Sequence, residues 1–419
     1  MSPVVESPRA PAPSATPLRV TRGAPWAVWA TAAVVLAFHA IWIGSYLAAG
    51  HETRDFIKIG IWYQGLSDAS DVIKVDPTYD PPRNREAGQG NGYDGQFSYY
   101  MALDFTHAHH YMDYPSYRYS RLLYPAVVRA AAFGEPELVP AAMIVVNWLA
   151  LGGLTLAVAA WLRRRGCSPW LALTVGLYPG LLVGLQRDLT EPLAYALVAA
   201  GVYLFDYGGK RRLLWAGLVF GLAGLARQTT LVFPLCLVGA ILLADRGTSP
   251  AGERLRANVA RASGFGALAI LPAVAYTVFL YLWLGSLAKG TLLEWVPFEG
   301  LIASRDWELK RQGVVLVTAV APALMVSAAA FMALRRGVHR VEIAFLLANV
   351  LLFVVLLHRL SYGDGYTSVG RIIAGVVLAA VLCVPWLREL GPGVRRTLVV
   401  SFALWLSMLP VIVVYGFGD

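Results

Sequence analysis

Long apolar segments, separated by short basic clusters, constrain this chain more than any other feature of its sequence. Hydrophobic residues make up 57% of its 419 residues and charged residues only 15%, unlike a soluble globular protein. A membrane crossing takes about 20 apolar residues, so the sequence predicts an all-α polytopic membrane protein with about eleven transmembrane helices. The predicted spans lie near residues 26–49, 138–162, 168–186, 190–206, 212–226, 229–244, 262–285, 313–334, 341–357, 372–387 and 397–415.

The basic clusters predict how these spans are oriented. Positive residues favour cytoplasmic loops, and an N-terminus inside the cell places five of the basic loops on the cytoplasmic side. Residues 1–25, rich in Pro, Ala and Ser, are predicted to form a disordered cytoplasmic tail. Residues 50–137 then form a large extracytoplasmic first loop, in which Tyr119–Phe133 has the pattern of an interfacial amphipathic helix. The five basic loops are near residues 163–165, 210–212, 246–261, 335–340 and 388–396.

Several classes of partner are not predicted. The net charge is +9, but the basic residues are scattered between apolar runs, so nucleic acid is not expected as a partner. Three cysteines at helix ends or in apolar segments provide no disulfide framework. The sequence His107-Ala-His109-His110 with Asp113 fits no spacing typical of metal ligands, and a solvated loop is the favoured interpretation. We therefore expect no metal and no cofactor.

Two apolar runs are interrupted by charge instead of ending in a long loop. One contains Arg187-Asp188-Leu-Thr190-Glu191-Pro192 and the other Arg227-Gln228-Thr229-Thr230. The second run, about 33 residues, would be near 50 Å long as one helix and must fold back at Arg227 inside a bilayer core of about 30 Å. Thr190 and Thr229 or Thr230 are candidate N-caps, so two helix N-termini and two arginines would form an anion site suited to phosphate. Alternatively, Arg187 pairs with Asp188 or Glu191, and Arg227 reaches the lipid headgroups.

Further polar residues are predicted on the same side of the membrane. The loop after the ninth span could belong to the site or be a solvated hairpin, and the aromatic loop from Gly285 to Gln312 is interpreted as a wall or lid. In the first loop, Asp94 lies among aromatic residues, where a shielded carboxylate has a raised pKa and can accept a proton from a hydroxyl. The alternative is that Asp94 is the N-cap of a helix over Gly95–Ala102. The polar residues of the loop after span nine are His358, Arg359, Tyr362, Asp364 and Arg371.

Residues 26–245 resemble the GT-C superfamily of membrane glycosyltransferases, and look most like bacterial relatives of the GPI mannosyltransferases. Two departures concern the site: Asp94 is followed by Gly95 where many members have a second acid, and Gln228 stands where relatives often have Glu. Residues 246–419 match no such pattern and are taken as a variable C-terminal transmembrane module. The resemblance rests on Tyr93-Asp94-Gly95, Tyr117-Arg118-Tyr119, Arg121-Leu-Leu-Tyr124-Pro125, Arg187 to Pro192 and Arg227-Gln228-Thr229.

The resemblance implies transfer of a hexose, such as mannose, from a polyprenyl-phosphate-linked donor to a lipid, glycan or protein acceptor at the extracytoplasmic face of the cell membrane. Asp94 would be the general base of an inverting displacement. Arg187, Arg227, Arg118, Arg359 and Arg371 would hold the donor phosphate. The substrate-binding residues would be Tyr93, Gln96, Tyr100, Arg121, Asp188, Glu191, Gln228, His358, Tyr362 and Asp364.

Two other functions fit parts of the sequence. A multi-pass transporter or lipid flippase also uses short, interrupted spans to build a site near the middle of the membrane. Such a protein should carry polar residues along the whole crossing path, whereas here they gather on the extracytoplasmic side. A scaffold, or a ligase or polymerase of the cell envelope, would more usually carry its large external loop late in the chain.

Overall fold

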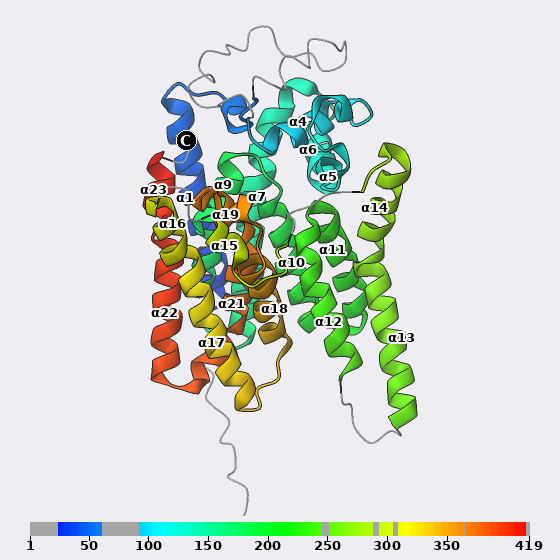
Figure 1. Cartoon of the computed structure of the whole chain (residues 1–419), viewed down its shortest axis with the longest axis vertical. Coiled ribbons are helices and arrows are strands. Elements are labelled where there is room, and N and C mark those ends of the chain that lie inside the picture. Colours follow the sequence, from blue (N-terminus) through cyan, green and yellow to red (C-terminus); the bar gives the residue numbers. More distant parts are fainter. Residues whose placement is uncertain are drawn as a thin grey trace, which may run out of the picture.

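The computed structural model describes residues 24–60, 92–244, 251–287, 293–304, 309–363 and 365–415 (Figure 1). Regular structure within these ranges is helical, apart from one isolated antiparallel bridge between Leu293 and Leu357. The all-α prediction is therefore confirmed for the described residues. Nearly all of the predicted tail and the turn-rich middle of the first loop lie outside them.

The helices of the first part of the chain follow the predicted order. α1 and α7 are the long helices on either side of the first loop, and the loop itself contributes the short helices α4, α5 and α6. The bounds are α1 Pro25–Ala48, η1 Thr53–Phe56, α4 Gly95–Leu103, η2 Ala108–Tyr111, α5 Pro115–Tyr119, α6 Leu123–Ala131, η3 Pro136–Leu138, α7 Val139–Arg164, η4 Pro169–Ala172, α8 Leu173–Gly176, α9 Pro179–Gln186, α10 Glu191–Tyr207, η5 Gly209–Arg211, α11 Arg212–Ala226, η6 Gln228–Leu231 and α12 Val232–Leu242.

The second part of the chain is built from helices that are more often broken. The two segments η7 and η8 are π-helical turns inside longer helices. The bounds are α13 Ala251–Ala269, α14 Leu271–Leu284, α15 Glu299–Ala303, α16 Leu309–Val315, η7 Leu316–Val320, α17 Ala321–Arg335, α18 Val341–Val350, η8 Leu351–Val355, α19 Arg359–Gly363, α20 Tyr366–Ile372, α21 Ala374–Leu387, η9 Arg388–Leu390, α22 Pro392–Leu406 and α23 Leu409–Tyr415.

The apolar helices indicate a lipid bilayer environment. Four are long and apolar enough to cross a membrane, and three pairs bent by 47° to 50° would raise the number to seven if each pair is one span. Each predicted span contains helix, but α10, α11 and α12 have 17, 15 and 11 residues, so eleven crossings remain a prediction. The four long helices are Pro25–Ala48, Pro136–Arg164, Lys310–Arg335 and Pro392–Tyr415.

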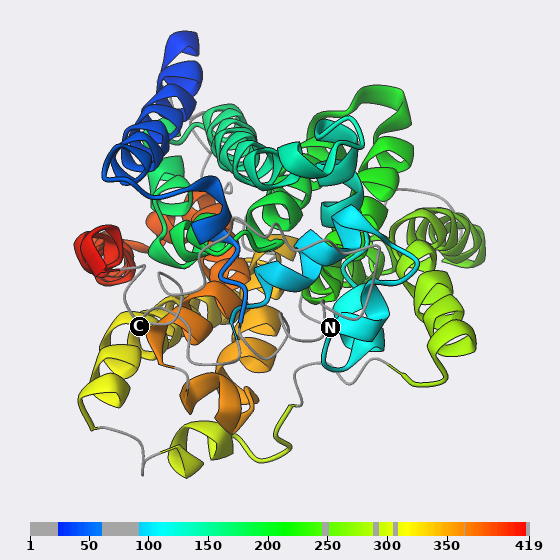
Figure 2. The same ribbon diagram turned by 90° about the horizontal axis from the view of Figure 1, so that it is seen from above.

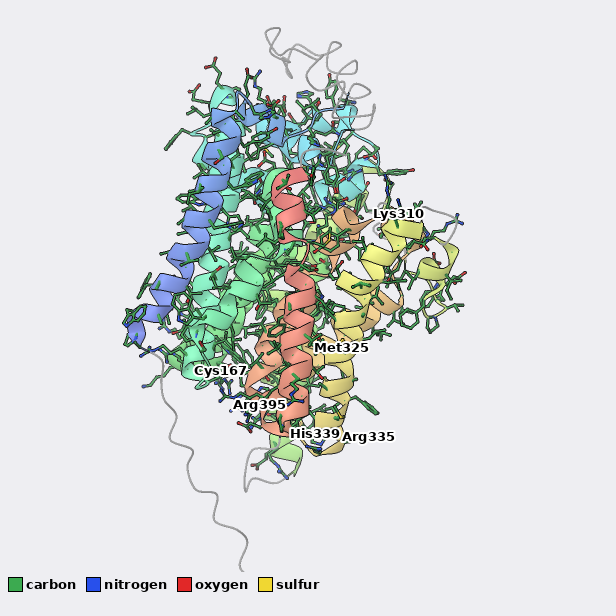
Figure 3. The ribbon with its side chains drawn as sticks, turned by 90° about the vertical axis from the view of Figure 1, so that its left-hand side faces the viewer. Cys167, Lys310, Met325, Arg335, His339 and Arg395 are labelled. Carbon is green, nitrogen blue, oxygen red and sulfur yellow. The ribbon has the colours of Figure 1, made fainter. Side chains whose placement is uncertain are left out.

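The two ends of the helix bundle differ. The short helices α4, α5 and α6 cover one end (Figure 1), and seen from that end they lie near the middle, with α1 and α13 toward the periphery (Figure 2). Cys167, Arg335, His339 and Arg395 gather toward the opposite end (Figure 3). Three of the basic clusters that the sequence places in the cytoplasm thus share one end of the molecule. Their orientation toward the cytoplasm stays a prediction.

The predicted amphipathic helix is present in part, but a different face of it is buried. The chain forms α5, then a turn, then α6, and the side chains of Tyr124, Val128 and Ala132 have no exposed surface. These residues are four positions apart, which places them on one helical face. The apolar stripe that the sequence singled out is half-buried or exposed: Leu122, Leu123, Ala126, Val127 and Ala130.

Close packing between α9 and α20 connects segments far apart in the sequence. A Cβ atom at Gly180 would lie 2.3 Å from the carbonyl oxygen of Gly370, so a side chain cannot fit there. The Tyr178 hydroxyl donates a hydrogen bond of 2.9 Å to the same carbonyl. Because α9 ends just before Arg187 and α20 carries Arg371, this contact places the two arginines near each other.

Candidate functional site

Asp94 lies where the first loop meets the break between α9 and α10. It stands immediately before α4, and the next residue, Gly95, packs on the backbone of that break. A Cβ atom at Gly95 would lie 2.1 Å from the carbonyl oxygen of Arg187, so only glycine allows this approach. The sequence Asp94-Gly95 therefore fixes the carboxylate beside the charged interruption of the apolar run.

Three arginines from distant segments contact the Asp94 carboxylate. Arg118 Nη1 donates to Oδ1 at 2.7 Å, while Arg371 Nη1 and Arg121 Nη1 donate to Oδ2 at 2.9 and 3.3 Å. The four side chains are only 9% to 17% exposed. Hydrogen bonds between ionised partners are the strong ones in proteins, so this contact holds the first loop onto α20.

The arginines decide the protonation state of Asp94. Burial by itself raises the pKa of the carboxyl, but the charges of Arg118, Arg371 and Arg121 outweigh burial and hold the pKa well below its ordinary value. The sequence predicted a raised pKa from aromatic shielding, and that prediction is wrong. In the ligand-free protein Asp94 is an ionised carboxylate and a weak base.

A second carboxylate approaches the same nitrogen of Arg371 as Asp94 does. Glu191, the first residue of α10, is fully buried, and its Oε1 lies 2.9 Å from Arg227 Nη1 and 3.7 Å from Arg371 Nη1. Arg187 and Arg371 both have their guanidinium carbons about 5 Å from the centre of the Tyr93 ring, at 5.0 and 5.1 Å.

Positive charge exceeds negative charge in this region, which we call the Asp94 cluster. Among the described residues it contains five arginines, and four of them contact the carboxylates of Asp94 and Glu191. The fifth lies against the Tyr93 ring, and the half-exposed Asp113 is at the edge of the cluster. A partly buried excess of guanidinium groups is a binding site for phosphate or another anion. The five arginines are Arg118, Arg121, Arg187, Arg227 and Arg371.

Most residues predicted from the two interrupted runs and from the first loop converge here, with changes in their contacts. Arg227 is buried, with 6% of its surface exposed, and pairs with Glu191 instead of reaching toward headgroups. Thr190 occupies the N-cap position of α10 without a capping hydrogen bond. Thr230 donates to the carbonyl of Arg227 and does not cap a helix, so the predicted threonine caps are wrong.

The helix alternative for Asp94 is correct for the backbone only. α4 begins at Gly95 as that alternative predicted, and Asp94 is its N-cap residue. However, the carboxylate makes no capping hydrogen bond and contacts the arginines instead. The N-cap position of Asp94 therefore does not determine what its carboxylate contacts.

The predicted loop after the ninth span does not contribute as a whole. Arg371 joins the Asp94 cluster, but Arg359 is exposed on α19. His358 Nε2 lies 3.4 Å from Glu294 Oε1, and the Tyr362 hydroxyl donates to the Val354 carbonyl. Asp364 lies outside the described residues.

The other predicted binding residues make structural contacts. Gln96 accepts a hydrogen bond from the Gly60 backbone through its side-chain carbonyl, and Gln228 donates to Thr277. Tyr100 is fully buried in the apolar core under the first loop. Asp188 is fully buried with a positive φ of 49°, and among the described residues neither of its carboxylate oxygens has a hydrogen-bond partner.

Two residues of the site were not predicted as site residues. Asp113 accepts two hydrogen bonds from Arg118, at 2.7 Å to Nε and 3.0 Å to Nη2, and so orients that guanidinium. Tyr117 accepts a hydrogen bond of 2.6 Å from Arg121 Nη2, and the Arg121 charge lowers the pKa of the Tyr117 hydroxyl. The turn around Tyr114, with φ of 44°, brings Asp113 back onto Arg118, and no spacing rule signals it.

No protein-family model matches this sequence, and neither a curated protein nor a solved structure is significantly similar to it. The interpretation of the site therefore rests on its own geometry and on the resemblance of its short motifs.

Proposed function

We propose that this protein transfers a sugar from a polyprenyl-phosphate-linked donor to an acceptor hydroxyl at the extracytoplasmic face of the membrane. The observation that carries the proposal is the contact of three arginines, Arg118, Arg121 and Arg371, with Asp94 where the first loop meets the apolar bundle. Arg227, paired with Glu191, and Arg187, beside Tyr93, lie next to this contact. The cluster lies between the short helices of the first loop and the apolar helices, and a lipid-linked donor likewise joins a polar phosphate to an apolar chain. A buried excess of guanidinium groups matches that phosphate in charge and geometry.

The reaction is a single displacement with inversion. The acceptor oxygen forms a bond to the anomeric carbon, and the bond from that carbon to the phosphate oxygen breaks, with its electron pair leaving on the phosphate. The acceptor proton passes to the Asp94 carboxylate. The phosphate changes from a diester with one negative charge to a monoester that gains a second, and fixed arginines stabilise the charge that develops.

The arginines divide into two groups by position. Arg118 and Arg121 come from the first loop and Arg371 from α20, and all three contact Asp94. Arg187 and Arg227 lie at the breaks of the two interrupted runs. Both groups together would hold the donor phosphate and stabilise the charge that develops on it.

The test is transfer of radiolabelled sugar from polyprenyl-phosphate donors by the purified full-length protein. Asp94→Asn should reduce transfer by at least about 10³-fold, in the range of lost acid–base catalysis, with normal insertion and yield. Near-normal transfer in this variant would remove Asp94 as the base. Movement of the lipid-linked sugar across a proteoliposome bilayer without transfer would favour a flippase.

The side of the membrane is tested separately. A cysteine at the exposed Glu135, beside α6, should react with a membrane-impermeant maleimide in intact cells. A cysteine at the exposed His339, at the opposite end, should react only after permeabilisation. The reverse pattern would place the Asp94 cluster in the cytoplasm and contradict the proposal.

A further inference from the structure

The arginines of the Asp94 cluster already contact two anionic groups of the chain itself, the carboxylates of Asp94 and Glu191. Two oxygens of Asp94 receive hydrogen bonds from three guanidinium groups, and Glu191 lies against a fourth and again against Arg371. A phosphodiester likewise presents two non-bridging oxygens to such donors. The contacts of Asp94 are thus those that a donor phosphate would need.

Arg118 and Arg121 also contact residues other than Asp94, and these contacts orient their guanidinium groups. Arg118 directs Nε and Nη2 to Asp113, which leaves Nη1 for Asp94. Arg121 directs Nη2 to the Tyr117 hydroxyl, which leaves Nη1 for Asp94. The guanidiniums of Arg118 and Arg121 are therefore each oriented by a second partner, so a different anion at the position of Asp94 would meet two donors that are already in position. Arg371 Nη1 also lies 3.7 Å from Glu191 Oε1.

The carboxylate of Asp94 is held by those arginines and by no described contact with its own backbone. It makes no capping hydrogen bond to α4, although it occupies the N-cap position. Rotation of its side chain would therefore release the three guanidiniums without disturbing the helix. The charged and titratable groups around it are the five arginines, Asp113, Tyr93, Tyr117 and Glu191.

We propose that Asp94 occupies the phosphate position in the ligand-free protein and that the donor phosphate exchanges with it, taking over the guanidiniums of Arg118, Arg121 and Arg371. This inference rests on the proposed function, because it assigns the donor as the exchanging anion. Once released, Asp94 is no longer neutralised by three cations and becomes a stronger base. The exchange makes base activation depend on donor binding, so an acceptor cannot be deprotonated in an empty site.

If the donor phosphate exchanges with Asp94, one substitution should have two opposite effects. It should strengthen the binding of polyprenyl phosphate, the product anion, and abolish sugar transfer. In Asp94→Asn the phosphate no longer competes with an internal carboxylate, so polyprenyl phosphate without sugar should bind about tenfold more tightly, while transfer is lost. A permanently structural Asp94 predicts weaker binding, since the arginines would lose their alignment. If Asp94 is a base that does not compete with phosphate for the arginines, Asp94→Asn should bind polyprenyl phosphate as tightly as the wild-type protein does.

The experiment measures equilibrium binding of a short-chain polyprenyl phosphate, and of inorganic phosphate, to the full-length protein in detergent. Asp113→Asn is the matched control, because it removes a carboxylate from Arg118 without freeing the position of Asp94, and its affinity should not increase. Equal or weaker binding by Asp94→Asn, with a cooperative thermal unfolding transition, would overturn the exchange. No binding of either anion by both the wild-type protein and Asp94→Asn would overturn it as well.

A measurement on the wild-type chain covers the case in which Asp94→Asn does not fold. Dicyclohexylcarbodiimide modifies protonated carboxyl groups in apolar surroundings, and the extent of modification at Asp94 can be read by mass spectrometry. Polyprenyl phosphate should increase this modification several-fold, because exchange removes Asp94 from its arginines. Unchanged or reduced modification at saturating anion contradicts the exchange.

The two proposals fail separately. Tighter binding by Asp94→Asn without sugar transfer by the wild-type protein from any polyprenyl-phosphate donor would leave the exchange standing and overturn the proposed function. Sugar transfer by the wild-type protein with unchanged binding in Asp94→Asn would do the opposite.

Discussion

Two buried charged clusters lie at opposite ends of this bundle, and they are built differently. At the end away from the first loop, Arg165 pairs with Asp206 and lies 3.8 Å from Glu342. Trp161 donates a hydrogen bond of 2.8 Å to Asp206, and Trp386 lies 5.3 Å from the Arg165 guanidinium. We call these five residues the Arg165 cluster. At its centre one arginine lies beside two carboxylates, whereas in the Asp94 cluster three arginines contact one carboxylate.

The difference in composition indicates a difference in role. The Arg165 cluster joins α7 and α10 to α18 and α21. The rings of Trp161, Tyr207 and Trp386 lie against its central arginine, and the neighbouring Arg340 lies over Trp386. Such a cluster fastens the first part of the bundle to the second. The Asp94 cluster joins segments even farther apart in sequence, since Asp94 and Arg371 are 277 residues apart, and its arginines outnumber its carboxylates. Under the proposed function, this excess of arginines is what distinguishes the Asp94 cluster from a purely structural contact between helices.

The largest effect should come from Arg371, which bridges the two carboxylates of the Asp94 cluster. Arg371→Ala leaves Asp94 and Glu191 close together with one cation fewer, and removing one partner of a buried ion pair costs about 3–5 kcal/mol. We expect transfer to fall by at least about 10³-fold, measured with radiolabelled donor. Arg359→Ala on the neighbouring α19 is the control, because Arg359 is exposed, and it should keep near-normal activity. Equal losses of transfer in Arg371→Ala and Arg359→Ala would mean that contact with Asp94 is not what makes an arginine of this loop important.

The next effect should come from the contact that positions Asp94. In Gly95→Ala the new methyl group would meet the Arg187 carbonyl at 2.1 Å, so α4 must shift. We expect about 10²-fold lower transfer and a loss of about 1–3 kcal/mol in unfolding free energy. Gly153 on α7 has open space around it, so Gly153→Ala should lower neither transfer nor the unfolding free energy. Wild-type transfer by Gly95→Ala would show that the position of Asp94 tolerates movement.

Local sequence patterns were sufficient to find one side of the Asp94 cluster. Arg187 and Arg227 interrupt apolar runs, and a charge in such a place needs a partner or ligand. The pairing of Asp94 with Arg371, 277 residues away, depends on how α9 and α20 pack, which no local pattern encodes. Arg359 and Arg371 belong to the same short polar loop in sequence, and only the turn between α19 and α20 separates the exposed residue from the buried one.

The Arg165 cluster was not predicted for a related reason. Asp206 and Arg165 lie near the ends of apolar segments, where charged residues are ordinary boundaries of a span, and no local pattern indicates that they meet. Glu342, at the start of a predicted span, turns inward and is 4% exposed. The interpretation that costly charges gather on one side of the membrane is therefore incomplete, because the opposite end also holds a buried carboxylate.

A smaller effect, mainly on stability, is expected at the Arg165 cluster. Asp206→Asn removes the partner of Arg165 while Glu342 remains nearby, so we expect a loss of about 1–3 kcal/mol in unfolding free energy. Transfer per folded molecule should change by less than about threefold. The measurement combines thermal unfolding with the Michaelis constant for the donor. If Asp206→Asn raised the Michaelis constant for the donor as much as Arg371→Ala does, the two clusters would not differ in role.

The smallest effect should come from the pair of Glu294 and His358, whose side chains are 20% and 17% exposed and which lies outside both clusters. The segment around Glu294 is held chiefly by its backbone, since the amide nitrogens of Glu294 and Phe298 donate to the carbonyls of Leu356 and Val355 at 2.8 and 2.7 Å. Glu294→Gln should therefore change the unfolding free energy by only about 0.5 kcal/mol and leave transfer within about twofold. Glu299→Gln, at an exposed carboxylate on the same segment, is the control for thermal unfolding. A loss of transfer in Glu294→Gln alone would make this segment part of the substrate site and extend the Asp94 cluster beyond its arginines.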